Sequence, residues 1–185
     1  MEQIEHYIGI DGCRAGWIAI HFSNGVYTYQ HMASLKELAI GSEKTRLLID
    51  MPLGLSSEEK PRNLDKLLRD KLEKKGSSVF NAPSRSALYA KSYQEANQLN
   101  KLVEGKGLSK QSYHLFPKIR ELETFYLDRK SKRFEIIESH PELCFQQLAS
   151  SNFQVLNKKK EQSGQQERLK LLVNHQPELA SLFNL

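Results

Sequence analysis

The chain has 185 residues, of which 39% are hydrophobic and 26% are charged, and its net charge is +5. This length allows one domain with a sizeable core, and the lack of any apolar run near ~20 residues argues against a membrane span. Its two cysteines are too few for a disulfide scaffold, and the N-terminus lacks the pattern of a signal peptide, so a reduced, cytoplasmic setting is expected.

The first predicted element is a strand that starts near Tyr7 and ends in the carboxylate of Asp11. Its apolar side chains alternate, so that Ile8 and Ile10 share one face. On the other face, Gly9 leaves open space beneath Asp11. A second apolar segment follows at once, which predicts a hairpin with an acid at its mouth.

Two turns are compatible with this hairpin. Asp-Gly is the strongest short hairpin signal, so Asp11 and Gly12 would form the narrower turn. A wider turn over Cys13–Gly16 fits the apolar pattern of the second strand, Trp17–Ile20, better. We favour the wider turn, which leaves Asp11 at the end of its strand.

The next elements predict a return to a parallel strand. Val26–His31 follows a Ser-Asn-Gly turn signal and is predicted to form a third strand. Ser34 then caps a short helix, Leu35–Ile40, with Glu37 completing a capping box. The apolar run Leu47–Ile49 is typical of a strand buried on both faces. The helix is expected to bring this fourth strand parallel to the first.

Asp50 closes the fourth strand as Asp11 closes the first. If these strands are parallel neighbours, both acids lie at the carboxyl edge of the sheet, where open α/β sheets bind ligands. A strand spacing of ~4.8 Å would bring them close enough to share metal ions. The alternative for Asp50 is a helix-capping or loop acid, which is common before a proline-containing turn.

The middle of the chain is basic and predicted to be helical. Residues 60–133 contain 18 Lys and Arg against 8 Asp and Glu, whereas the remainder contains 9 against 14. The predicted helices are Pro61–Lys75 with a stripe of Leu64, Leu67, Leu68 and Leu72, Tyr93–Val103, and Gln111 to about Tyr126, kinked or split by Pro117. A basic lobe beside an acidic site suits a polyanionic substrate, although solvated Lys-rich helices give the same pattern.

The loop Ser77–Arg85 joins the first two of these helices and is rich in hydroxyl groups. Hydroxyl and guanidinium groups, such as those of Ser84 and Arg85, can hold a phosphate. The alternative interpretation is a capped connector without a ligand.

A fifth strand, Phe134–Glu138, places a third carboxylate at a strand end. The Ser-His-Pro-Glu sequence that follows is typical of a helix start, with Glu142 in the first turn. The alternative is that Glu138, His140 and Glu142 are metal ligands or proton carriers. A last helix is predicted over about Gln165–Asn174.

Five stretches resemble, in order, the family called domain of unknown function 429. They are Gly9–Trp17 (GIDGCRAGW), Ile49–Gly54 (IDMPLG), Ser78–Arg85 (SVFNAPSR), Gln111 with Pro117–Glu121 (PKIRE), and Glu138–Glu142 (ESHPE). The resemblance runs from Tyr7 to about Arg168. The family is generally described as a predicted ribonuclease H-like nuclease, a label inferred mainly from fold.

The resemblance implies an α/β fold with a ribonuclease H-like mixed sheet, in which three antiparallel strands precede parallel strands, flanked by helices. It implies one domain over residues 1–185, with residues 60–133 as a basic helical insertion between the fourth and fifth strands. Its acids on the first and fourth strands correspond to Asp11 and Asp50. The family usually also carries an acidic pair on a C-terminal helix, which the sequence up to Leu185 does not show. Either the sequence is cut short, or this member lacks that ligand. In the second case, a non-catalytic nucleic-acid-binding module is the favoured alternative.

The leading hypothesis is a metal-dependent phosphodiester hydrolase that acts on nucleic acid. The predicted catalytic residues and ligands of Mg²⁺ or Mn²⁺ are Asp11, Asp50 and Glu138. The predicted substrate-binding residues are Arg14, Ser84, Arg85, Gln111, Lys118, Arg120 and His140. Among them, the cations Arg85, Lys118 and Arg120 would hold the nucleic-acid backbone. The rival enzyme is an actin-like phosphotransferase, which opens on a similar hairpin. Against it, the sequence shows no second glycine-rich phosphate loop.

Overall fold

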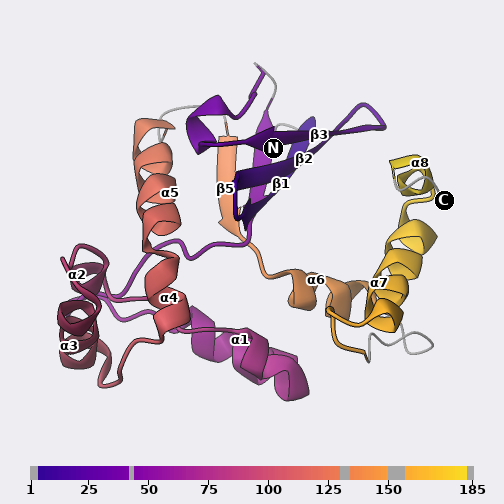
Figure 1. Cartoon of the computed structure of the whole chain (residues 1–185). Coiled ribbons are helices and arrows are strands. Elements are labelled where there is room, and N and C mark those ends of the chain that lie inside the picture. Colours follow the sequence, from indigo (N-terminus) through magenta and orange to yellow (C-terminus); the bar gives the residue numbers. More distant parts are fainter. Residues whose placement is uncertain (1–3, 42–43, 130–133, 150–156, 183–185) are drawn as a thin grey trace.

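The computed structural model describes residues 4–41, 44–129, 134–149 and 157–182 and has a mixed sheet with helices around it (Figure 1). Its strands are β1 (His6–Cys13), β2 (Gly16–Ser23), β3 (Val26–Met32), β4 (Thr45–Ile49) and β5 (Phe134–Glu138). Their order is β3-β2-β1-β4-β5. β1, β2 and β3 pair antiparallel, whereas β4 and β5 run parallel to β1. The predicted α/β class and mixed sheet are therefore confirmed.

Helices fill the segment between β4 and β5 and the segment after β5 (Figure 1). They are α1 (Leu64–Leu72), the 3-10 turn η2 (Glu73–Ser78), α2 (Arg85–Leu88), α3 (Tyr93–Glu104), α4 (Lys110–His114), α5 (Phe116–Arg129), α6 (Pro141–Leu148), α7 (Gln162–His175) and α8 (Leu179–Leu182). Another 3-10 turn, η1 (Leu35–Glu37), lies between β3 and β4. Within the described residues, none of these helices has the length and apolar character needed to cross a membrane.

The β1–β2 hairpin has the wider of the two predicted turns. Cys13 pairs with Gly16, so Arg14 lies at the tip. β1 continues past Asp11 to Cys13, so the prediction that Asp11 ends its strand is wrong; Asp11 instead lies next to the end of the β1–β4 pairing at Ile10 and Ile49. Gly16 has a φ of +136°, and a Cβ atom there would lie 2.0 Å from the carbonyl oxygen of Met32. Side chains are strained at such a φ, so only glycine fits where the hairpin approaches the end of β3 so closely.

One face of the sheet forms the main core, and the other face carries Asp11. Ile8 and Ile10 of β1 are buried on the core face, in one cluster with residues of α5 such as Ile119 and Leu122. On the opposite face, a Cβ atom added to Gly9 would meet no described atom within 4 Å. The open space predicted beside Asp11 is therefore present among the described residues.

The helix predicted over Pro61–Lys75 is shorter in the structure. It begins at Leu64 and ends at Leu72, where a 3-10 turn replaces it. The side chain of Arg62 is bound to loop carbonyl groups, which holds the preceding stretch outside the helix. Of the predicted leucine stripe, only Leu68 and Leu72 are buried, so the apolar face is narrower than the sequence indicated.

Of two other predicted helices, one is split as expected and the other is shorter than expected. The helix predicted from Gln111 to about Tyr126 is split into α4 and α5 beside Pro117, which agrees with the predicted kink or split. The short helix predicted after Ser34 is a single 3-10 turn, although its predicted capping box with Glu37 is present.

Candidate functional site

A cavity of about 330 Å³ lies at the carboxyl ends of β1, β4 and β5, and we call it the acidic cavity. The acids that line it are Asp11, Asp50, Asp65, Glu138 and Glu142. Two cations, Lys159 and Arg168, also line it. The three strand-end acids predicted from the sequence therefore surround one space.

Asp11 and Asp50 occupy neighbouring positions on adjacent parallel strands. The backbone N–H of Asp50 donates to the carbonyl oxygen of Ile10 at 3.1 Å, which extends the β1–β4 pairing past Ile10 and Ile49. Neighbouring strands lie ~4.8 Å apart, and successive side chains point to opposite faces. Both carboxylates therefore lie on the face of the sheet opposite to the core.

The surroundings of Asp50 raise its pKa to about 6. Burial is the largest cause, and the negative charges of Asp11 and Glu138 add to it, whereas Lys159 opposes the shift. Among the described residues, neither the Asp11 nor the Asp50 carboxylate accepts a hydrogen bond. These two acids thus repel each other, and within the part of the chain that the structure describes the charge of Lys159 offsets this repulsion only in part.

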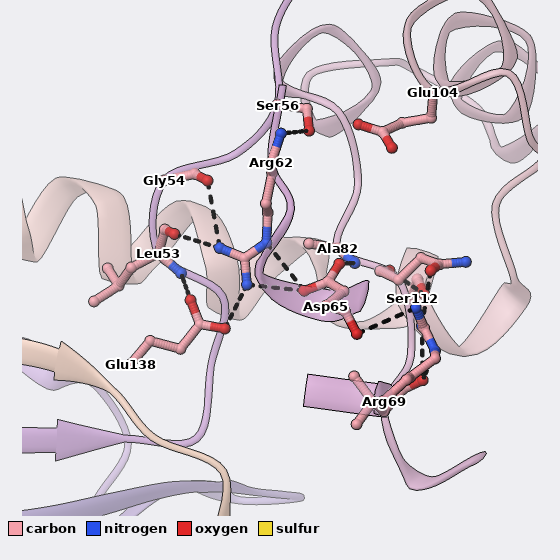
Figure 2. A network of polar contacts seen from close by, with 12 residues as sticks. Leu53, Gly54, Ser56, Arg62, Asp65, Arg69, Ala82, Glu104, Ser112 and Glu138 are labelled. Atoms are coloured by element: carbon pink, nitrogen blue, oxygen red, sulfur yellow. Dashed lines mark hydrogen bonds and ion pairs between the residues drawn. The ribbon is translucent and has the colours of Figure 1, made fainter. Parts of the chain in front are cut away.

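Glu138 and Asp65, in contrast, are both bound by Arg62 (Figure 2). The Arg62 side chain is 6% exposed, and its guanidinium group donates to Glu138 at 2.5 Å and to Asp65 at 2.9 Å. Burial disfavours its charge, but Glu138 and Asp65 outweigh this effect and raise the pKa of Arg62. The backbone N–H groups of Leu53 and Ala82 donate to Glu138 and Asp65 at 2.8 and 2.7 Å.

Glu142 is also neutralised by cations. Arg168 of α7 donates to both of its carboxylate oxygens, at 2.7 and 2.9 Å, and Lys75 lies 3.1 Å away. Burial opposes ionisation, but the hydrogen bonds from Arg168 and Lys75 hold the pKa of Glu142 below its usual value. This ion pair ties α7 to α6 beside the acidic cavity.

His140 lines the acidic cavity at the start of α6. Its Nδ1 atom is buried and has no hydrogen-bond partner among the described residues. Burial lowers the pKa of His140, so its imidazole is mainly neutral near pH 7. A neutral imidazole presents one nitrogen as an acceptor.

Gln111 and His140 are the predicted substrate-binding residues that line the acidic cavity; the other five lie elsewhere. Ser84 is buried and caps α2 by accepting from a backbone N–H group. Arg85 pairs with Glu123 at 2.8 Å. Arg14 is exposed at the tip of the β1–β2 hairpin.

Lys118 and Arg120 are both engaged within the protein. Lys118 donates to the carbonyl oxygen of Gly16 and lies 4.4 Å from the ring centre of Trp17. The Nε atom of Arg120 donates to the carbonyl oxygen of Leu88 at 2.8 Å. In this arrangement both side chains stabilise the packing of α5 against its neighbours.

Sequence reasoning missed the two arginines that bind acids around the cavity. Arg62 and Glu138 are 76 residues apart, and Arg168 and Glu142 are 26 residues apart. The spacing of Arg62 and Asp65 is that of an ordinary i,i+3 pair, which surface arginines also form, and the fold brings the more distant partners, Glu138 and Glu142, to these arginines. Within the described residues, no group of three or more His, Cys, Asp or Glu side chains is arranged to hold a metal ion.

A family model described as "Protein of unknown function (DUF429)" matches residues 9–183. This match includes every residue that lines the acidic cavity. It also includes all five stretches on which the resemblance was based, from Gly9–Trp17 to Glu138–Glu142. No curated protein and no solved structure matches the chain.

Proposed function

The chain belongs to the DUF429 family, and we propose that it is a metal-dependent phosphodiester hydrolase that acts on nucleic acid. The strand order β3-β2-β1-β4-β5 supports a ribonuclease H-like architecture for it. In such a sheet, acids at the ends of the first and fourth strands are neighbours, as Asp11 and Asp50 are here.

One observation carries the proposal. Of the acids around the cavity, Asp65, Glu138 and Glu142 are bound by arginine, lysine or backbone N–H groups. Asp11 and Asp50 accept no hydrogen bond among the described residues, yet they lie next to each other on adjacent strands at the carboxyl edge of the sheet. Paired like charges of this kind are costly until a cation neutralises them.

The side chains present fit a magnesium or manganese ion. Mg²⁺ is usually bound through one or two carboxylates and completes its coordination with waters and substrate phosphates. Two available carboxylates are therefore enough, and a third ligand from Glu138 is not required. When bound, the ion would supply an activated water and stabilise the leaving oxygen.

The chain's own residues would orient the reaction. Asp11 and Asp50 would hold the cation at the ends of β1 and β4. Glu138 would position the loop after Asp50, since it accepts from the N–H of Leu53 and from Arg62. Lys159, whose charge acts on Asp50, also lines the acidic cavity and would attract a phosphate.

The test is a cleavage assay on single- and double-stranded DNA and RNA with millimolar Mn²⁺, with ATP turnover measured in parallel. We expect cleavage that requires Mn²⁺ and stops in EDTA, because no donor among the described residues hydrogen-bonds either carboxylate and the charge of Lys159 only partly offsets their repulsion. Binding without cleavage would instead favour a non-catalytic module. ATP turnover without cleavage would favour a phosphotransferase.

Manganese binding is expected to strengthen by about tenfold per pH unit up to about pH 6 and then level off. Asp50 must lose its proton to bind a cation, and its pKa is about 6. The stability of the metal-free protein is expected to change with pH in the opposite direction. The pKa of Asp50 in the folded state lies above its ordinary value of 3.8. The folded state therefore binds more protons than the unfolded state, and the free energy of unfolding falls as the pH rises between 3.8 and about 6.

Calorimetric titration with Mn²⁺ at several pH values, together with urea unfolding of the metal-free protein, measures both trends. Asp50→Asn is the control for unfolding, and the stability of this metal-free variant should lose the pH dependence that comes from Asp50. An affinity for Mn²⁺ that stays constant from about pH 5 to about pH 7 would contradict the assignment of Asp50.

A further inference from the structure

We propose that the acidic cavity holds a single unpaired nucleotide, with its phosphate toward Asp11 and Asp50 and its base against an aromatic wall. The placement of the phosphate near Asp11 and Asp50 rests on the proposed function. A free mononucleotide and the terminal nucleotide of a single strand offer the same chemistry. The experiment below distinguishes these two sources.

The size of the cavity favours one nucleotide over a duplex. Its volume of about 330 Å³ lies at the low end of the ~300–1,000 Å³ that is typical of small-molecule sites. On one side it is bordered by α6 and α7, which the pair of Glu142 and Arg168 joins. Duplex recognition, in contrast, needs contacts across successive grooves. The space suits a base that has been separated from its strand.

Part of the cavity lining is apolar and aromatic. Phe80 and Phe145 line the cavity together with Pro52 and Pro141. Phe80 is partly exposed and belongs to neither core cluster, so its ring is available to the cavity. The bases of single strands stack on aromatic side chains in this way.

Two polar groups in the cavity have no partner among the described residues. The buried Nδ1 atom of His140 is unpaired, and the Gln111 side chain makes no hydrogen bond. A base edge carries donors and acceptors that can satisfy both groups. Toward the strand ends, Lys159 supplies a positive charge near Asp50 for the phosphate.

The cations outside the cavity are consistent with this reading. Arg85, Lys118 and Arg120 are held by Glu123 and by backbone carbonyl groups. None of them lines the acidic cavity. A ligand of one nucleotide does not need a long track of free cations, because its affinity comes from the base and one phosphate.

The experiment is calorimetric titration with AMP, with ribose 5-phosphate, with a short single strand and with the same sequence as a duplex. AMP is expected to bind at least about tenfold more tightly than ribose 5-phosphate, because only AMP can stack. Phe80→Ala should weaken AMP binding about tenfold and leave ribose 5-phosphate binding unchanged. Tyr29→Ala, at an aromatic side chain that is 71% exposed on β3, is the matched control and should change neither. Phe80→Leu, which keeps the apolar volume, should also weaken AMP binding.

Equal binding of AMP and ribose 5-phosphate, or of duplex and single strand, would overturn the inference. A single strand that binds more tightly than AMP would identify the strand end as the source, and the reverse order would identify the mononucleotide. The titrations are run in Mn²⁺ and in EDTA to separate the two proposals. Base-dependent binding with no Mn²⁺ binding would support the nucleotide site and contradict the proposed metal-dependent hydrolase. Mn²⁺ binding without base dependence would support the metal site and contradict the nucleotide site.

Discussion

Asp50→Asn is expected to weaken Mn²⁺ binding at least about 100-fold while leaving the metal-free protein as stable as the wild type, or more stable. The loss is large because a direct ligand matters at least as much as the residues that only orient ligands, whose mutation already costs 10–100-fold. The metal-free variant is expected to be at least as stable as the wild type, because the raised pKa of Asp50 means that its negative charge is unfavourable in the folded state. Asp11→Asn should behave in the same way, since its charge is part of that repulsion.

Thermal denaturation with and without millimolar Mn²⁺ measures both effects. Wild type at 100 times its Kd should gain about 2.7 kcal/mol, and the two variants should gain almost nothing. Asp70→Asn, at an exposed acid on α1 outside the cavity, is the control and should keep the full gain. A scaffold aspartate would give the reverse result, because its Asn variant would lose ~1–3 kcal/mol of stability in the absence of metal. That result, with no Mn²⁺ effect on wild type, would remove the metal site.

Arg62→Met is expected to lower the free energy of unfolding by about 3–5 kcal/mol, the cost of removing one partner from a buried ion pair. The variant leaves Glu138 and Asp65 without their shared cation, and both of these side chains are 14% exposed. It also removes the donor to the carbonyl groups of Leu53 and Gly54, so the loop after Asp50 loses its anchor. Urea unfolding measures the change.

Arg46→Met is the matched control, because Arg46 also pairs with a glutamate, Glu135, but its side chain is 36% exposed. Exposed pairs contribute about 0–1 kcal/mol, so this variant should change little. Adding Glu138→Gln to Arg62→Met should recover part of the loss, since it removes one of the two uncompensated charges. Equal, small effects of Arg62→Met and Arg46→Met would show that the Arg62 network does not stabilise the fold.

Much of the sheet could be predicted because it depends on residues close in sequence. The alternation of Ile8 and Ile10 with Gly9 and Asp11 determines which face of β1 is buried. The wide hairpin turn follows from the same pattern. The capping box of Ser34 and its glutamate is also a contact within one turn of the chain.

Helix lengths were harder to predict where a tertiary contact competes with local propensity. Pro61 and the leucines after it predicted a long helix. In the structure, Arg62 binds loop carbonyl groups and an acid 76 residues away, and the helix starts at Leu64 instead. The gain from those contacts outweighs the small propensity of a few helical residues.

The pair of acids could be predicted from the sequence, because a carboxylate that follows an apolar strand segment is a local pattern and parallel neighbouring strands bring two such positions together. Which of the acids around the cavity accept a hydrogen bond within the described residues depends on contacts between distant parts of the chain. Glu138 has the same local pattern as Asp50, yet Arg62 and a backbone N–H group bind it, whereas Asp50 receives no such donor among the described residues. The same holds for Lys118, a basic residue that the fold directs to a carbonyl oxygen. A charge's partner is set by distance in space, and a linear pattern of residue types does not contain that distance.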